Sequence, residues 1–95
     1  MAIRLIVTFT AAPGKAQDFA DAFKPAQDIT HKEEGCEQYE LLRSLDNADK
    51  LVLLERWTSA ELLQKHMEAM QARGHSPTAS FRAEGSQPSL ERYEV

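Results

Sequence analysis

The residues best suited to chemistry lie between positions 55 and 66 of the 95-residue chain. His66 follows Leu62 by four positions and precedes Met67, which places it on the apolar face of a predicted helix. An imidazole can act as a general acid or base near neutral pH. The alternative is a structural histidine that donates one hydrogen bond between helix and sheet. His66 is the first candidate for a catalytic residue.

Glu55 and Trp57 lie on the same face of a predicted strand as Leu53. If this face is turned toward the helices, Glu55 is a partly buried carboxyl group, and a raised pKa would suit it to proton transfer. The alternative, which the sequence favours, is an ordinary ion pair with Arg43 or Arg92. Glu55 is nevertheless the second catalytic candidate, because a buried carboxyl group on this face could transfer protons. Trp57 is predicted to be a core and pocket-wall residue on which a planar aromatic substrate could stack.

The apolar pattern predicts the elements that position these residues. Runs rich in β-branched, aromatic and leucine residues predict strands at 2–10, 36–45, 50–57 and 88–95. Apolar residues at intervals of three and four predict two helices, one starting at Lys15 and one ending near Ala72. The inner face of the second helix is expected to hold Leu62, Leu63, His66, Met67, Ala69 and Met70.

Local signals predict where these helices bend and end. Pro25 lacks a backbone donor and predicts a kink or break in the first helix, and Gly35 is suited to end it. Thr58 and Glu61 have the spacing of a capping box at the start of the second helix. Residues 74–87 are polar, and a short helical turn is expected around 77–81.

The element order β-α-β-β-α-β predicts a single α+β domain over residues 1–95 with the ferredoxin-like arrangement. In that fold an antiparallel sheet carries both helices on one face. Apolar residues nevertheless occur on both faces of two strands, since Ile6, Val52 and Leu54 oppose the main apolar set. A sheet with one face in water alternates more cleanly. We therefore expect a homodimer that covers the second face.

The hairpin between the second and third strands decides which side chains share a face. Turn-forming residues at 46–49 predict this hairpin. Tyr39 and Arg43 share one face of the second strand, and a four-residue loop is expected to set Tyr39 opposite Arg56. A five-residue loop is expected to set it opposite Trp57. A slip of one residue swaps the faces, so the sequence leaves open whether Tyr39 and Glu55 lie together.

Composition excludes several classes of protein. The net charge is −4, and the scattered Lys and Arg residues form no basic stripe, so no nucleic-acid partner is expected. No apolar run is long enough to span a membrane, and residues 1–5 lead straight into a strand pattern, so we expect a soluble, cytoplasmic protein. Cys36 is the single cysteine and is expected to be a small buried residue. No motif for a metal or a bound cofactor is present.

Three segments in order resemble the antibiotic biosynthesis monooxygenase family, a group of dimeric α+β-barrel proteins. They are Glu34-Gly35-Cys36-Glu37-Gln38-Tyr39, then Leu54-Glu55-Arg56-Trp57-Thr58-Ser59, then His66, and Pro13-Gly14-Lys15 is similar too. The resemblance covers roughly residues 2–70. It implies a dimeric α+β barrel, and activities that range from cofactor-independent quinone-forming monooxygenases to haem degradation, isomerisation and proteins with no known substrate.

Two departures from the family pattern narrow these activities. Haem-degrading members carry an asparagine on the first strand, whereas the only asparagine here is Asn47 in the hairpin turn. Many members also carry a second histidine about one turn after the first, and Gln71 lies near that place. His75 lies slightly further on and is not taken as its replacement. Both His31 and His75 are expected to be solvent-exposed.

Three hypotheses of function follow. The first is a cofactor-independent monooxygenase for an aromatic or quinol-type compound, with His66 as base. Its pocket would be lined by Tyr39, Glu55, Trp57 and His66, and bordered by Arg43, Met67 and Met70. The second is an isomerase or other proton-transfer enzyme that needs no oxygen. The third is a non-catalytic dimer that binds a small ligand or assembles with a partner.

Overall fold

The computed structural model describes residues 1–74 and 76–95. The prediction for His75 therefore lies outside the described residues. The elements follow in the order β1 (Ile3–Thr10), α1 (Ala16–His31), β2 (Cys36–Arg43), β3 (Lys50–Trp57), α2 (Ala60–Arg73), a short 3₁₀ helix η1 (Ala79–Phe81) and β4 (Ser89–Glu94). This is the predicted β-α-β-β-α-β order, and η1 lies where the short helical turn was expected.

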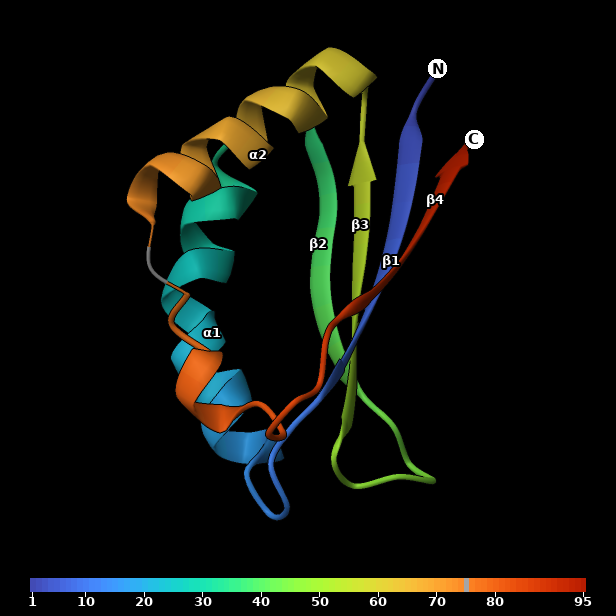
Figure 1. Cartoon of the computed structure of the whole chain (residues 1–95). Coiled ribbons are helices and arrows are strands. Elements are labelled where there is room, and N and C mark those ends of the chain that lie inside the picture. The colour runs from blue at the N-terminus through green and yellow to red at the C-terminus, as the bar shows by residue number, and fades with distance from the viewer. Residues whose placement is uncertain (75) are drawn as a thin grey trace.

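The strands form one antiparallel sheet in the order β2-β3-β1-β4. Both helices lie on the same side of this sheet, as Figure 1 shows, so the predicted ferredoxin-like α+β fold is confirmed. The two central strands, β1 and β3, each carry alternate apolar residues toward the helices. Because alternate side chains point to the same face of a strand, one face of the sheet is apolar and packs against the helices.

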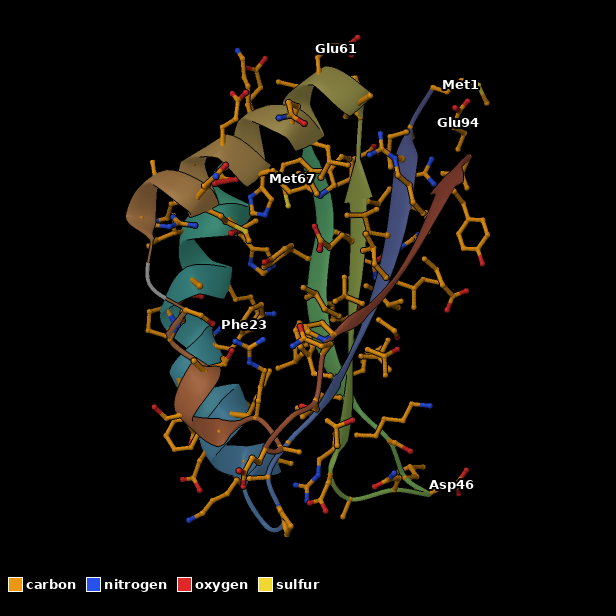
Figure 2. The ribbon with its side chains drawn as sticks, in the orientation of Figure 1. Met1, Phe23, Asp46, Glu61, Met67 and Glu94 are labelled. Atoms are coloured by element: carbon orange, nitrogen blue, oxygen red, sulfur yellow. The ribbon has the colours of Figure 1, made fainter. Side chains whose placement is uncertain are left out.

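The core lies between the sheet and the helices. Leu5, Leu53 and Trp57 from the central strands are almost completely buried there, together with Phe23 of α1 and Leu63 of α2. Figure 2 shows Phe23 on the side of α1 that faces the sheet. Burying large side chains from two layers against one another is the main source of stability in a chain of this size.

The register of the β2–β3 hairpin differs from both expected alternatives. Tyr39 lies opposite Glu55, not opposite Arg56 or Trp57. The backbone N–H of Ser44 donates to the carbonyl of Lys50 at 3.0 Å, so residues 45–49 form the loop. Figure 2 shows Asp46 at the tip of this hairpin. The fifth loop residue, Leu45, comes from the β2 side, which moves the partner of Tyr39 from Arg56 to Glu55, so the partner expected for a five-residue loop was wrong.

The first helix corrects two local predictions. Residues Ala16–His31 form one helix that contains Pro25, so the break predicted as one outcome at Pro25 does not occur. The helix ends at His31, and Gly35, with φ of +87°, lies in the turn that leads into β2. Ile29 is 49% exposed, and its neighbour Thr30 is buried.

The second helix begins one residue later than the predicted capping box. Ser59, not Thr58, is the N-cap, and its side-chain oxygen accepts from the backbone N–H of Leu62 at 3.3 Å. Gly74 ends the helix in a left-handed conformation. The inner face is narrower than expected, because only Leu63 and His66 are buried. The other members expected there are partly or largely exposed, namely Leu62, Met67, Ala69 and Met70.

The sheet face away from the helices is partly apolar, as the sequence indicated. On this face, Ile6 and Thr8 of β1 lie opposite Leu54 and Val52 of β3. Leu42 of β2 lies opposite Val52 along the other edge of β3. Leu42 is 41% exposed, and every residue of β4 is exposed. No helix within residues 1–74 and 76–95 has the length and apolar character that a membrane span requires.

Candidate functional site

A cavity of about 560 Å³ lies between the sheet and the helices. Its wall is mainly apolar and comes from all four strands, both helices and the segment between α2 and β4. A cavity of this size and composition is typical of small-molecule sites, which are mostly apolar with a few polar groups placed among them. Among the residues of its wall are Leu5, Val7, Phe9, Phe23, Tyr39, Leu53, Glu55, Leu63, His66, Met67, Met70 and Gln71.

Glu55 contributes a buried carboxyl group to the wall of this cavity. It is 5% exposed, and the indole N–H of Trp57 donates to its Oε1 at 3.0 Å. Burial raises the pKa of Glu55, because removal from water disfavours the charged form, while the Trp57 hydrogen bond and nearby His66 act in the opposite direction. Glu55 is therefore a carboxyl group that holds its proton more tightly than one in water.

His66 lines the cavity from α2 and is 4% exposed. Its Nδ1 lies 2.6 Å from Oε2 of Glu33. The imidazole packs against the indole of Trp57, with ring centroids 4.6 Å apart, and edge-on against Tyr39 at 5.5 Å. The ring is thus held by one hydrogen bond and two aromatic neighbours, while the residue borders the cavity.

Glu33 is a site residue that the sequence did not predict. It lies in the turn between α1 and β2, 33 positions before His66. Its own surroundings in the sequence, Lys32-Glu33-Glu34, are those of an ordinary charged turn. The only available signal was its place just ahead of the Glu34–Tyr39 segment, and that signal does not distinguish Glu33 from Glu34.

Tyr39 lies opposite Glu55 on the cavity side of β2 and is 4% exposed. Burial raises the pKa of the Tyr39 hydroxyl, and the neighbouring Glu55 carboxyl raises it further. Its backbone carbonyl accepts hydrogen bonds from Gln27 Nε2 at 3.0 Å and His31 Nε2 at 2.8 Å. The structure therefore brings Tyr39, Glu55 and His66 together around one cavity, with the Tyr39 phenol neutral.

Two of the predicted pocket residues lie elsewhere. Trp57 is fully buried behind Glu55 and His66 and is not part of the cavity wall, so a substrate cannot stack on it directly. Arg43 is at the hairpin end of β2, where its Nε donates to the carbonyl of Ala48 at 3.1 Å. Arg43 does not border the cavity, and no ion pair within residues 1–74 and 76–95 links Glu55 to Arg43 or Arg92.

The two methionines of α2 are on the cavity wall and not in a filled core. Met67 is 36% exposed and Met70 is 45% exposed, and both border the cavity. Figure 2 shows Met67 on the sheet-facing side of α2. Flexible thioether side chains in this place can adapt to ligands of different shape. Gln71 also borders the cavity one turn after Met67.

The remaining candidates for chemistry are the Cys36 thiol and groups of side chains that could bind a metal ion. Cys36 is half-buried, and burial, followed by the charges of Glu33 and Glu55, raises the pKa of its thiol. The thiol form is a weak nucleophile. In the described part of the chain, no group of three or more His, Cys, Asp or Glu side chains could hold a metal ion.

Comparison with known proteins identifies relatives of this fold. A family model described as antibiotic biosynthesis monooxygenase matches residues 2–76. No curated protein matches the sequence. Among solved structures, a conserved protein from Methanosarcina mazei Go1 has a TM-score of 0.85 and 26% identity, with 98% of this chain and 91% of that chain covered.

Two other similar solved structures belong to proteins that are described by an activity. A Caulobacter crescentus CB15 protein, provisionally described as an antibiotic biosynthesis monooxygenase, has a TM-score of 0.82 and 25% identity, covering 99% of this chain and 89% of that one. SnoaB from Streptomyces nogalater, described as a cofactor-independent oxygenase, was solved as a point mutant. It has a TM-score of 0.78 and 14% identity, covering 99% of this chain and 92% of that one. At 14% identity the likeness to SnoaB concerns the fold alone.

Proposed function

Since the chain belongs to the antibiotic biosynthesis monooxygenase family, we propose that it is a cofactor-independent monooxygenase acting on a small aromatic or quinol-type compound. One observation carries this proposal. Two acid–base side chains, His66 and Glu55, border a single apolar cavity of about 560 Å³. The cavity is large enough for a fused-ring compound, and its apolar wall suits an aromatic body.

The proposed reaction starts with removal of a proton from the substrate. His66 accepts a proton from a phenol hydroxyl or from the ring CH₂ group opposite the carbonyl of its keto form, which leaves an electron-rich anion. The anion transfers electrons to molecular oxygen, and a carbon–oxygen bond forms to give a hydroperoxide. Its O–O bond then breaks as the same carbon loses its second hydrogen and water leaves. Overall, a CH₂ group and O₂ give a C=O group and water, so the substrate supplies all the electrons and no other reductant is needed. The apolar wall keeps bulk water from the anion.

Glu55 and Tyr39 are proposed to act on the oxygen atoms of the substrate and intermediate. Glu55 holds its proton tightly because it is buried, so it can donate a hydrogen bond to a developing oxyanion. Tyr39, opposite Glu55, is a neutral phenol and can act in the same way. Trp57 fixes the Glu55 carboxyl from behind through its indole N–H.

Oxygen uptake tests this proposal. The purified protein is incubated with a panel of anthrones and 1-naphthols, and oxygen consumption and quinone formation are measured together. For an active compound, the His66→Ala variant is expected to lose about 100-fold or more in kcat, the range for loss of a general base. The matched control is Lys65→Ala, an exposed neighbour on α2, which should keep the wild-type rate. Equal turnover by His66→Ala and wild type would remove His66 from this role.

A second candidate function is an isomerase or other proton-transfer enzyme. It is favoured by the presence of two acid–base groups, His66 and Glu55, on one cavity wall, because one could remove a proton and the other return it. Turnover that persists without oxygen and yields an isomer of the substrate would select this function. Ligand binding without turnover of any compound would favour the non-catalytic reading.

A further inference from the structure

The contact between Glu33 and His66 joins two distant parts of the chain. Glu33 Oε2 lies 2.6 Å from His66 Nδ1, and the His66 side chain is 3% exposed while that of Glu33 is 21% exposed. A pair this short and this well shielded from water is stronger than a surface ion pair. The contact therefore determines which nitrogen of the neutral imidazole carries the proton.

The backbone around Glu33 is fixed on both sides. Its N–H donates to the carbonyl of Thr30 at 3.0 Å, and its own carbonyl accepts from the N–H of Cys36 at 3.2 Å. The turn is further tied to the start of α2, because the carbonyl of Gly35 accepts from the N–H of Thr58 at 2.9 Å. The Glu33 carboxyl is thus presented to His66 by an anchored turn.

This arrangement selects one tautomer of the imidazole. A carboxylate can only accept a hydrogen bond, so the neutral ring must carry its proton on Nδ1, facing Glu33. The other nitrogen, Nε2, then has a free lone pair, and no hydrogen bond within the described residues uses it. Trp57 and Tyr39 pack against the ring, so it cannot turn over freely.

The other ionisable groups near His66 do not compete for this role. Glu55, from β3, is bound to the indole of Trp57 and not to the imidazole. Tyr39 and Cys36, from β2, have raised pKa values through burial and stay neutral. Of the residues that the structure describes, Glu33 is the one that makes a hydrogen bond to the His66 side chain.

We propose that Glu33 is the positioning residue of this site: it holds His66 in the Nδ1–H tautomer with Nε2 available to the substrate. Its carboxylate also stabilises the imidazolium that forms when Nε2 accepts a proton. This inference rests on the proposed function, because it assigns Glu33 a role through His66. The competing explanation is that Glu33 only ties the turn to α2.

Nitrogen NMR of the histidine rings tests the tautomer without any substrate. In ¹⁵N-histidine-labelled wild-type protein above the pH of imidazole protonation, we expect the His66 signals of the Nδ1–H form, assigned by their loss in His66→Gln. In Glu33→Ala we expect a mixture of both tautomers. The matched control is Glu34→Ala, which removes an exposed carboxylate from the same turn and should leave the wild-type signals.

Either of two results would overturn the positioning role. One is an Nε2–H tautomer in the wild-type protein, a result that does not depend on whether Glu33→Ala folds. The other is an unchanged Nδ1–H population in folded Glu33→Ala. Both readouts are independent of turnover, so they separate failure of this inference from failure of the monooxygenase proposal.

Kinetics with any active compound supply the second readout. Glu33→Gln keeps an amide oxygen that can accept from Nδ1–H but removes the charge that stabilises the imidazolium. We expect kcat to fall by at least about 10-fold with KM changed less than about twofold, because the carboxylate that stabilises the imidazolium is lost. A purely structural tie would leave kcat unchanged in the folded variant.

Discussion

At the scale of single residues, the site depends on two carboxyl groups in different surroundings. Glu33 is partly exposed and bonds to His66, whereas Glu55 is 5% exposed and bonds to a neutral indole. Burial raises the pKa of Glu55, so this carboxyl favours its neutral form more than a carboxyl in water does. Divergent environments of this kind are how a protein obtains both an acid and a base from carboxyl side chains.

The raised pKa of Glu55 predicts how stability depends on pH. The folded state holds this proton more tightly than the unfolded state, whose carboxyl has the ordinary value of 4.5. The stabilising contribution is therefore fully present below pH 4.5 and is lost as pH rises through the folded-state pKa, with a slope of at most about 1.4 kcal/mol per pH unit. The Glu55→Gln side chain does not ionise, so the variant does not lose stability in this way, and its amide oxygen can still accept the hydrogen bond from the Trp57 indole N–H.

Urea unfolding from about pH 4.5, the ordinary value of the carboxyl, up to about pH 8 measures this effect. We expect the free energy of unfolding of Glu55→Gln to gain on that of the wild type as pH rises. Glu84→Gln, at an exposed glutamate, should follow the wild-type curve. If the free energy of unfolding of the wild type instead rises relative to that of Glu55→Gln as pH increases, the folded protein does not raise the pKa of Glu55.

The sequence predicted part of this residue-scale picture. The helical period was enough to place His66 on the apolar face of its helix, and the strand period placed Glu55 on the same face as Leu53 and Trp57. They could not predict Glu33, since a turn residue has no periodic pattern and its partner lies 33 positions away. Arg43 shares its strand face with Tyr39, but it lies at the hairpin end of β2 and does not border the cavity, a difference that the strand period alone does not show.

At the scale of elements, the turn between α1 and β2 is packed closely against α2. Gly35 has φ of +87°, and a Cβ built on it would lie 2.6 Å from Leu62 Cδ1 and 2.8 Å from Leu62 Cβ. Only glycine fits such an approach in this conformation. Leu62 is one turn before His66 on α2, so this contact helps to set the distance between Glu33 and His66.

Replacement of Gly35 by Ala is therefore expected to be strongly destabilising. The left-handed conformation costs about 1 to 2 kcal/mol, and the clash with Leu62 adds roughly as much again, so we expect a loss of about 3 kcal/mol. Gly85→Ala is the matched control, because Gly85 has φ of +75° with nothing within 4 Å of a built Cβ. Chemical denaturation of both variants measures the difference, and equal losses would contradict the close contact.

The elements themselves were largely predictable, and the pairing between them was not. Strand and helix positions follow from local patterns of apolar residues, so their predicted limits lie close to the observed ones. The partner of Tyr39 depends on the length of the loop and on which strand supplies its fifth residue, neither of which changes the apolar pattern. The sequence could therefore not decide that Tyr39 and Glu55 share the cavity wall.

At the scale of the whole molecule, the sheet has one covered face and one open face. The helices cover the face that carries the core, as Figure 1 shows. On the open face, Ile6 lies opposite Leu54, and Leu42 lies opposite Val52. An apolar strip across the middle of a sheet is unfavourable in water, and a second copy of the same face would cover it. We therefore predict that the protein is a homodimer through this face.

Sedimentation of charged variants tests the homodimer and the face together. The wild type is expected to sediment at twice the chain mass of 10.7 kDa at micromolar concentration. Leu54→Glu places a charge at the centre of the open face, and burying an unpaired charge costs at least several kcal/mol, so the dissociation constant should rise about 100-fold or more. Leu45→Glu makes the same change in the hairpin loop, where Leu45 is fully exposed, and should leave the dimer intact. A wild type that sediments at 10.7 kDa would contradict the dimer, and a Leu54→Glu dimer of unchanged affinity would move the interface to another face.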